Sequence, residues 1–250
     1  MDLGLADKRV LVTGATKGIG LATAREFAAE GAKVAITYNT AVERAAEIID
    51  ELGGPERACA VPYELRDPES TTAAVDAVVE RWGGIDIVVA NALWFTWVDP
   101  RETAKFEDLP ATEWSAQLRA NVDGHLHTVQ RAVGGMRKRG WGRVVLLSSV
   151  TAYHGLPGSE IYSASKAAMH GFARGLMWGG GGVLVNVVAP GATTTESMDA
   201  VAPEITEESL RNTPSGRLSS PQDVARVIVF LCSEANNGVN GELVHAAGGR

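Results

Sequence analysis

Short runs of apolar and β-branched residues alternate with longer amphipathic stretches from one end of the chain to the other. This alternation is typical of a parallel sheet whose two faces are covered by helices. We therefore expect a single α/β domain over residues 1–250, with a doubly wound sheet of about seven strands. The predicted strands cover residues 9–13, 33–37, 57–61, 85–90, 143–148, 183–188 and 242–245, and the predicted helices cover 21–29, 41–52, 68–82, 112–139, 161–178 and 221–233.

Two segments show neither pattern, namely residues 92–111 and residues 191–219, of which the second is rich in Thr, Ser and Pro. Long loops inside a compact domain are usually functional. We expect residues 191–212 to form a lid that closes over bound ligands, so that the order of this lid depends on the ligand.

The composition is that of an ordinary globular protein. With 23 basic and 30 acidic residues, the net charge is −7, which argues against general affinity for nucleic acid or anionic membranes. Cys59 and Cys232 form no Cys-x-x-Cys motif, and the five histidines show no metal-ligand spacing. No apolar run approaches the roughly 18 residues of a membrane helix, and the N-terminus does not resemble a secretory signal. We therefore expect a cytoplasmic protein without a metal, a nucleic-acid partner or a membrane association.

Glycine is unusually frequent, at 28 of 250 residues, and three glycines stand where the first predicted strand passes into a helix. Such a turn lets a pyrophosphate approach the backbone closely, and the first amides of the helix face its charge. The position in the first strand–helix unit favours a dinucleotide site over an ordinary surface turn. The predicted contacts are Gly14, Thr16, Lys17, Gly18, Ile19 and Gly20.

The segment Thr-Gly-x-x-x-Gly-Ile-Gly from Thr13, Ser149, the pair Tyr162-x-x-x-Lys166, and Pro190-Gly191 occur in this order. In order and spacing the whole chain resembles the short-chain dehydrogenase/reductase family. The resemblance implies a Rossmann-type sheet, an NAD(P)-dependent oxidoreductase, and a homo-oligomer, either a tetramer or a dimer. Residues 1–110 would then bind the dinucleotide, and residues 111–250 would carry catalysis and substrate. Further cofactor contacts implied by the resemblance are Glu64 and Leu65 at the adenine, Asn91 and Ala92 at the ribose, and Pro190, Gly191, Thr193 and Thr195 near the carboxamide.

The end of the second predicted strand bears on which nicotinamide cofactor is preferred. NAD-preferring sites usually place a carboxylate there, whereas this chain has Tyr38, Asn39 and Thr40. The first acidic residue beyond them, Glu43, lies inside the next helix, so we expect no carboxylate to repel a 2′-phosphate. Lys17 adds a cation. These residues predict NADP(H), although a solvated Lys17 and hydroxyls that only cap the helix are the alternative.

Tyr162 and Lys166 are four residues apart on a predicted helix, which places their side chains on one face. We expect the ammonium to lower the pKa of the phenol. Ser149 ends the fifth strand, where open α/β sheets bind ligands. By resemblance, Tyr162 protonates a carbonyl oxygen that Ser149 also hydrogen-bonds, while Lys166 tunes Tyr162 and holds the nicotinamide ribose. Asn121 matches the asparagine that positions a relay water in this family.

The chain departs from the family pattern after the fourth strand, where Ala-Asn-Ala-Leu replaces Asn-Asn-Ala-Gly and three aromatic residues follow. These aromatic side chains either line a pocket for a flat aromatic substrate or pack under a loop or a second subunit. The candidate substrate contacts are Leu93, Trp94, Phe95, Trp97, Ser149, Thr151, His154 and Tyr162.

A second departure is the run from Gly179 to Gly182, for which the sequence offers no physical account beyond a shortened junction. Reductases that act on carrier-protein thioesters have a basic residue near this place, and none is present here. Arg137, Lys138 and Arg139 offer either part of such a basic patch or a solvated helix end.

Together the departures favour an NADPH-dependent ketoreductase that tailors aromatic polyketides, resembling the angucycline C-6 ketoreductases. The competing hypothesis is a 3-oxoacyl-[acyl-carrier-protein] reductase. A third hypothesis is a dinucleotide-sensing regulator without catalysis, which the intact Ser149, Tyr162 and Lys166 disfavour.

Overall fold

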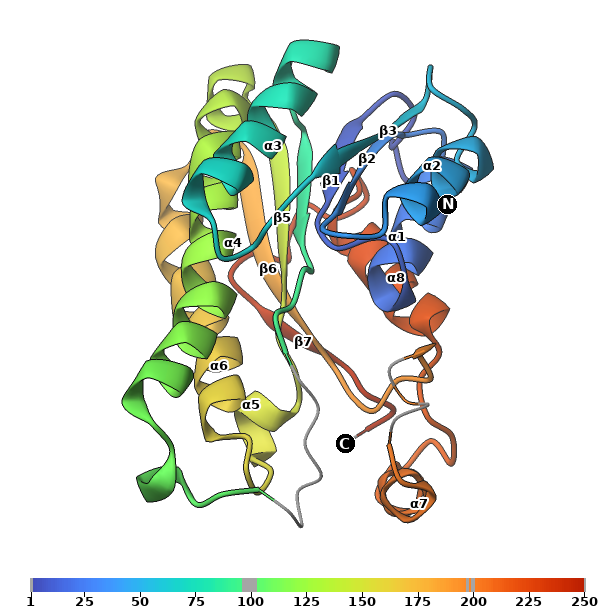
Figure 1. Cartoon of the computed structure of the whole chain (residues 1–250). Helices are drawn as coiled ribbons and strands as arrows, with labels where there is room; N and C mark the ends of the chain where they lie inside the picture. The colour runs from blue at the N-terminus through green and yellow to red at the C-terminus, as the bar shows by residue number, and fades with distance from the viewer. Residues whose placement is uncertain (1, 96–102, 197, 199–200, 250) are drawn as a thin grey trace.

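The computed structural model describes residues 2–95, 103–196, 198 and 201–249, so the predicted substrate contact Trp97 lies outside the described residues. Its centre is a parallel sheet in the order β3-β2-β1-β4-β5-β6-β7 (Figure 1). The chain adds strands outward from β1 to β3 and then continues with β4 on the other side of β1. The crevice for ligands is therefore expected at the carboxyl ends of β1 and β4. The strands are β1 (Arg9–Val12), β2 (Lys33–Tyr38), β3 (Ala58–Pro62), β4 (Ile87–Ala90), β5 (Gly142–Leu147), β6 (Val183–Pro190) and β7 (Leu243–Ala246).

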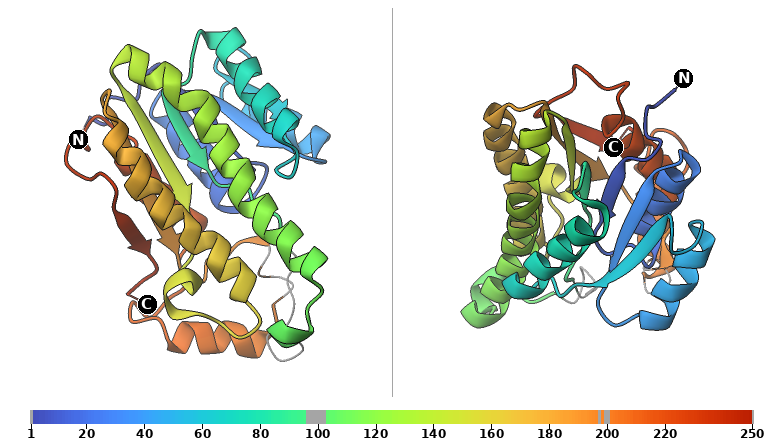
Figure 2. Two further views of the ribbon diagram at one scale, coloured as in Figure 1. Left: turned by 90° about the vertical axis from the view of Figure 1, so that its left-hand side faces the viewer. Right: turned by 90° about the horizontal axis from the view of Figure 1, so that it is seen from above.

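Helices cover both faces of the sheet, which confirms the predicted fold class. One face carries α1, α2 and α8, and the other carries α3, α4 and α6, as Figure 1 and the turned views of Figure 2 show. The helices are α1 (Gly18–Ala29), α2 (Val42–Glu51), α3 (Pro68–Trp82), α4 (Ala111–Arg139), α5 (Thr151–His154), α6 (Glu160–Leu176), α7 (Pro203–Arg211) and α8 (Pro221–Leu231). Two 3₁₀ turns, Phe106–Asp108 and Met177–Gly179, lie before α4 and after α6.

Alternate residues of each strand feed two separate cores. Val10 and Val12 of β1 belong to the core that includes Phe27 of α1, whereas Leu11 belongs to the core that includes Met136 of α4. Because both faces are covered, the strands are apolar at nearly every position. This double burial explains why the strands are easy to recognise in the sequence.

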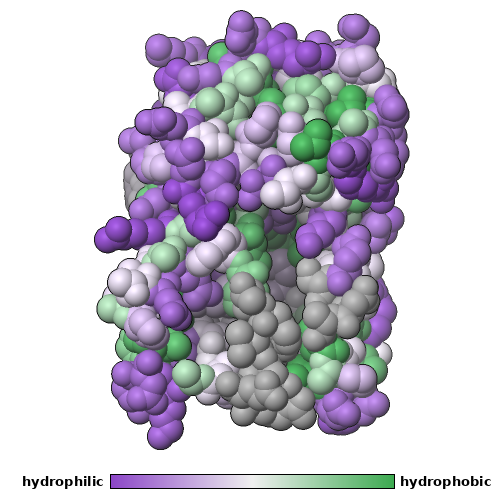
Figure 3. Space-filling view, in the orientation of Figure 1, coloured by the Kyte–Doolittle hydropathy of each residue, from purple (hydrophilic) through white to green (hydrophobic). Residues whose placement is uncertain are grey.

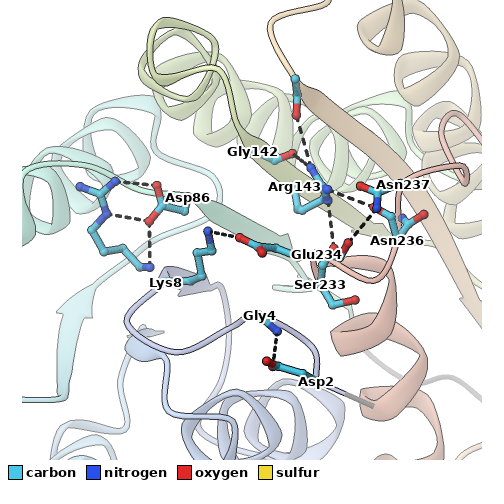
Figure 4. A network of polar contacts seen from close by, with 12 residues as sticks. Asp2, Gly4, Lys8, Asp86, Gly142, Arg143, Ser233, Glu234, Asn236 and Asn237 are labelled. Atoms are coloured by element: carbon cyan, nitrogen blue, oxygen red, sulfur yellow. Dashed lines mark hydrogen bonds and ion pairs between the residues drawn. The ribbon is translucent and has the colours of Figure 1, made fainter.

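Polar contacts at the amino ends of the strands tie the segment between α8 and β7 to the sheet (Figure 4). Arg143 of β5 is buried, and its guanidinium donates to the carbonyl oxygens of Ser233 and Asn236 at 3.3 and 3.0 Å. Lys8 pairs with Glu234 at 2.7 Å. These contacts lie at the end of the sheet away from the ligand crevice, so we assign them to stability.

Asp86, immediately before β4, holds a second ionic cluster at this end of the sheet. Its carboxylate accepts hydrogen bonds from the Nε and Nη2 of Arg9 at 2.7 and 2.5 Å, and Arg139 lies 3.3 Å away. Burial raises the pKa of Asp86, but the hydrogen bonds and charges of the two arginines outweigh burial and leave this pKa below its usual value. The ionised form is therefore the one that the fold stabilises.

The segment expected to be a loop at 191–219 contains a helix, α7, which the sequence analysis missed. Pro203 takes its first position, as prolines often do, but Ala202 before it offers no capping side chain and no residue of α7 is buried. The burial pattern and the N-cap signal that reveal other helices are therefore missing here. Among the described residues, we find no helix with both the length and the apolar character needed to cross a membrane.

The run Gly179 to Gly182 connects α6 to β6 across the end of α4, and the structure accounts for it. Gly180, Gly181 and Gly182 have φ angles of +62°, +68° and +70°, which L side chains rarely adopt. A Cβ on Gly182 would collide with the carbonyl oxygen of Gly140, and one on Gly179 would collide with the guanidinium of Arg137. The run thus lets the chain pass close to the end of α4. Helix α6 ends at Leu176 instead of continuing to 178.

Candidate active site

The glycine turn lies between β1 and α1, at the crevice of the sheet. Gly14 and Gly18 have φ angles of +64° and +56°. A Cβ on Gly14 would lie 2.8 Å from the Cα of Ala92, and one on Gly20 would lie 2.6 Å from the Nδ2 of Asn91. These two glycines are therefore required by the contact between the turn and the loop after β4. Asn91 fastens that contact, because its Nδ2 donates to the carbonyl oxygens of Thr13 and Gly14 at 2.9 and 3.1 Å.

Gly18 is the first residue of α1, so its N–H has no partner within the helix and can bind an anion. Its N–H donates to a carboxylate oxygen of Glu196 at 3.1 Å, across from the segment after β6. A carboxylate at this amide shows that the helix start accepts negative charge, so the turn fits a dinucleotide phosphate. Thr16, Ile19 and the exposed Lys17 belong to the same turn.

The segment after β6 approaches the turn through only some of its predicted residues. Thr195 lies beside Gly18, since a Cβ on Gly18 would meet its methyl group at 3.3 Å. Thr193 is buried instead, and its hydroxyl donates to the carbonyl oxygen of Gly191 at 2.9 Å. The carbonyl oxygen of Pro190 accepts from the backbone of Val150 at 3.0 Å, which joins the ends of β5 and β6.

Tyr38, Asn39 and Thr40 stand at the carboxyl end of β2, with Asn39 and Thr40 exposed. A carboxylate that the sequence analysis did not place here lies beside them, because Glu64, which follows the neighbouring strand β3, accepts a hydrogen bond from Asn39 Nδ2 at 3.1 Å. Arg66 pairs with Glu64 at 3.0 Å and is the main reason that the pKa of this carboxyl falls to about 2. The carboxylate is thus ionised and largely neutralised by its partner.

Leu65 is buried beneath this end of the sheet and packs against Gly124 of α4, where a Cβ would collide with its backbone oxygen. Arg66 extends over the ring of Trp94, 5.3 Å from its centroid. The loop after β3 therefore contacts the loop after β4, which joins the predicted adenine end to the predicted substrate residues.

Ser149, Tyr162 and Lys166 come together from the loop after β5 and from α6, as predicted. The Oγ1 of Thr151 donates to the Oγ of Ser149 at 2.9 Å. Lys166 is buried; its Nζ donates to the carbonyl oxygen of Leu147 at 2.9 Å and lies 5.9 Å from the centroid of the Tyr162 ring. The arrangement holds two hydroxyls and one amine around a single site.

The pKa of Tyr162 differs from expectation. Burial raises this pKa, and a hydrogen bond with Ser149 lowers it only in part. The prediction that Lys166 lowers it overall is wrong, because the burial of Tyr162 outweighs the other contributions to its pKa. Burial also lowers the pKa of Lys166, to about 8. The phenol is therefore protonated near neutral pH, as a proton donor must be.

Asn121 of α4 is fully buried and clamps the backbone of Trp94. Its Oδ1 accepts from the Trp94 N–H at 3.0 Å, and its Nδ2 donates to the Trp94 carbonyl oxygen at 2.8 Å. The same Nδ2 also donates to the carbonyl oxygen of Gln117 at 2.9 Å. Both amide hydrogens are thus engaged in positioning the loop after β4. Ser148, which precedes Ser149, contacts the carbonyl oxygen of Lys166 and the ring of His170.

A cavity of about 550 Å³ opens beside Tyr162, between the loop after β4, the start of α4 and the loop before α6. We call it the aromatic pocket; its lining includes Trp94, Phe95, Leu109, Trp114, Gln117 and Leu156. The ring centroids of Phe95 and Tyr162 are 4.9 Å apart. Figure 3 shows apolar surface in the middle of the face that Figure 1 presents, between flanks of hydrophilic side chains.

The substrate predictions are divided by this geometry. Trp94 and Phe95 line the aromatic pocket, and Tyr162 adjoins it only through Phe95. The other predicted contacts among the described residues are absent from its lining, namely Leu93, Ser149, Thr151 and His154. His154 packs against Tyr153, with ring centroids 5.0 Å apart. Sequence analysis missed Leu109, Trp114, Gln117 and Leu156, because they come from segments whose fold the pattern left open or from a helix with no recognised motif.

A family model described as enoyl-(acyl carrier protein) reductase matches residues 14–250. A short-chain dehydrogenase from Burkholderia cenocepacia, solved in complex with NADP, superimposes with a TM-score of 0.86 and 32% identity over 100% of this chain and 99% of that one. The chain belongs to the short-chain dehydrogenase/reductase family. It is therefore an oxidoreductase of the NAD(P)-dependent class that acts on hydroxyl or keto groups.

Two curated members of the short-chain dehydrogenase/reductase family show the range of its relatives. A 3-oxoacyl-[acyl-carrier-protein] reductase of Aquifex aeolicus is 35% identical over 100% of this chain and 99% of that protein. A hydroxynaphthalene reductase-like protein of Metarhizium guizhouense is 33% identical over 98% of this chain and 95% of that protein. These relatives agree on the family but carry different substrate names, so the substrate has to be argued from the geometry of the site.

Proposed function

We propose that this protein is an NADPH-dependent ketoreductase that reduces a ketone of a polycyclic aromatic polyketide intermediate, in the manner of angucycline C-6 ketoreduction. The observation that carries the proposal is the aromatic pocket, which brings Phe95 to 4.9 Å from Tyr162. Flat aromatic rings bind well to such walls because they bury large apolar area and stack on other rings. The similarity to a hydroxynaphthalene reductase-like protein supports the same substrate class.

Each of the three assembled side chains has its own role in the proposed reduction. Tyr162, whose burial keeps it protonated, donates its proton to the ketone oxygen. Ser149, oriented by Thr151, donates a hydrogen bond to the same oxygen as negative charge develops there. Lys166 stabilises the phenolate that remains and holds the nicotinamide ribose. When bound, the reduced nicotinamide supplies the hydride.

The preference for NADPH rests on the surroundings of the ribose. Lys17 is exposed at the glycine turn, and Asn39 and Thr40 are exposed at the end of β2. Glu64 does not overturn this preference, because its ion pair with Arg66 offsets its charge. We propose that Lys17 and the Asn39–Thr40 segment receive the 2′-phosphate. We also propose a cytoplasmic homo-oligomer, and residues 191–212 as its lid.

The alternative is a 3-oxoacyl-[acyl-carrier-protein] reductase, which the Aquifex relative favours. Such an enzyme docks an acidic carrier on basic side chains. Here Arg137 donates to the carbonyl oxygen of Leu176, and Arg139 donates to Asp86. Two members of the candidate basic patch are therefore used within the fold, which favours a free aromatic substrate. A regulator without catalysis is disfavoured by the assembled Ser149, Tyr162 and Lys166.

The deciding experiment compares purified protein on polycyclic aromatic ketones and on acetoacetyl thioesters, with NADPH and with NADH. We expect higher kcat/KM for the aromatic ketones and lower KM for NADPH. Tyr162→Phe should lose at least about 100-fold in kcat, because it removes the proton donor, and should bind NADPH as the wild type does. Tyr153→Phe, which changes an exposed phenol after Ser149, is the matched control. Preference for the thioesters, or turnover by Tyr162→Phe, would refute the proposal.

A further inference from the structure

His125 is a buried histidine of α4 to which neither the proposed mechanism nor the sequence motifs give a role. It lies one helical turn after Asn121, and its relative exposure is 0%. Neither of its ring nitrogens makes a well-formed hydrogen bond within the described parts of the chain. A buried polar group without a good partner destabilises the fold, so an apolar side chain would serve packing better. The ring therefore calls for a polar partner.

The surroundings of His125 identify what that partner must be. Burial and the positive charge of Lys166, on α6, both lower the pKa of His125, to about 3, while a loose hydrogen bond with the backbone of Ala92 raises it. A buried phenol, Tyr63, contacts Thr128 at 2.8 Å one turn along α4. The imidazole is thus neutral, with one N–H donor and one acceptor nitrogen.

Lys166 carries hydrogen-bond donors that a neutral imidazole can accept. Its ammonium carries three donors, and the carbonyl oxygen of Leu147 takes one of them at 2.9 Å. Asn121, the nearest polar neighbour of His125 along α4, has both of its amide hydrogens and its oxygen engaged with backbone groups. A neutral imidazole acceptor at this depth suits a hydrogen bond that comes from the ammonium, directly or through one water molecule.

We propose that His125 is a positioning residue of the proton relay, whose acceptor nitrogen holds a buried water against the Nζ of Lys166. The ring itself touches neither substrate nor cofactor. A proton that Tyr162 gives to the ketone oxygen is replaced by one from Lys166, and the held water replaces the proton on Lys166. Bulk solvent then replaces the proton on the water, so His125 keeps its own N–H and remains neutral throughout.

The kinetic test uses His125→Leu, which removes both nitrogens, and His125→Gln, which keeps a donor and an acceptor. We expect His125→Leu to lose about ten-fold in kcat, with both KM values nearly unchanged, as loss of one relay group implies. Loss of an acceptor also disfavours the charged form of Lys166, so the alkaline limb of the kcat profile should move to lower pH. His125→Gln should recover most of both effects, and His127→Leu, a change of the next histidine on the same helix, is the control.

A second measurement does not depend on turnover, so it decides the inference even if the proposed substrate class fails. In ¹⁵N-histidine NMR spectra of the protein without ketone, His125 should show one neutral tautomer with a slowly exchanging N–H. Lys166→Met should change its nitrogen shifts, whereas Arg174→Met, a charge change later on α6, should not. Unchanged shifts in Lys166→Met, or a kcat profile of His125→Leu that matches the wild type, would overturn the inference. Equal losses in His125→Gln and His125→Leu would do so as well.

Discussion

Glu196 occupies the amide at the start of α1 where we propose that a cofactor phosphate binds, so removing its charge should tighten NADPH binding. Its carboxylate accepts the Gly18 N–H at 3.1 Å, at the amide proposed to face a cofactor phosphate. An anion at an exposed helix N-terminus contributes about 0.3–1 kcal/mol, which must be given up before a phosphate can take its place. Glu196→Gln should therefore lower the Kd for NADPH by about two- to five-fold.

The assay is a titration of NADPH fluorescence at low and at high salt. The effect should shrink with salt, because exposed charges are screened. Glu204→Gln is the matched control: it makes the same charge change in the same segment, and Glu204 has no hydrogen bond or ion pair in the parts of the chain that the structure describes. An unchanged or raised Kd in Glu196→Gln would refute the reasoning, as would an equal effect of Glu204→Gln.

Two further predictions concern stability, each measured by urea unfolding. Asp86→Asn should lower the free energy of unfolding by about 2–4 kcal/mol, because it leaves Arg9 partly buried without its charge partner. The folded state lowers the pKa of Asp86, so the stabilisation by its carboxylate should be present at neutral pH. This stabilisation should be lost as the pH falls through the lowered pKa. Equal stability of variant and wild type at pH 7 would contradict this. Gly182→Ala should cost more than about 2 kcal/mol, whereas Gly140→Ala, in the left-handed conformation with open space around it, should cost only about 1 kcal/mol, because both have positive φ but only the first adds a collision. Similar losses in the two variants would show that backbone strain alone matters.

Features encoded locally were predictable from the sequence. The strands stand out because each is buried on two faces, and the spacing of Tyr162 and Lys166 places both on one face of α6. The helix predicted over 68–82 begins and ends at those residues, and the carboxylate of Asp67 before it accepts the Glu69 N–H at 2.9 Å. In each case a few neighbouring residues determine the outcome.

Features that depend on neighbouring strands or on burial were not predictable. Glu64 reaches Asn39 only because β2 and β3 end side by side, although 25 residues separate them in the chain. The pKa of Tyr162 rises because the fold buries it, which no spacing rule reports. The run Gly179 to Gly182 could be explained only once the position of α4 was known.

The clamp of Asn121 on Trp94 has a consequence for how substrate range can change in this protein. One amide fixes the backbone of the loop that supplies the pocket wall, and His125 follows one turn later on the same helix. Side chains of the wall can therefore be exchanged freely, because the clamp holds only main-chain atoms. Insertions or deletions next to Trp94 would instead move the helix that supports the chemistry. Diversification of this enzyme, by selection or by a protein engineer, should proceed by substitution at fixed loop length.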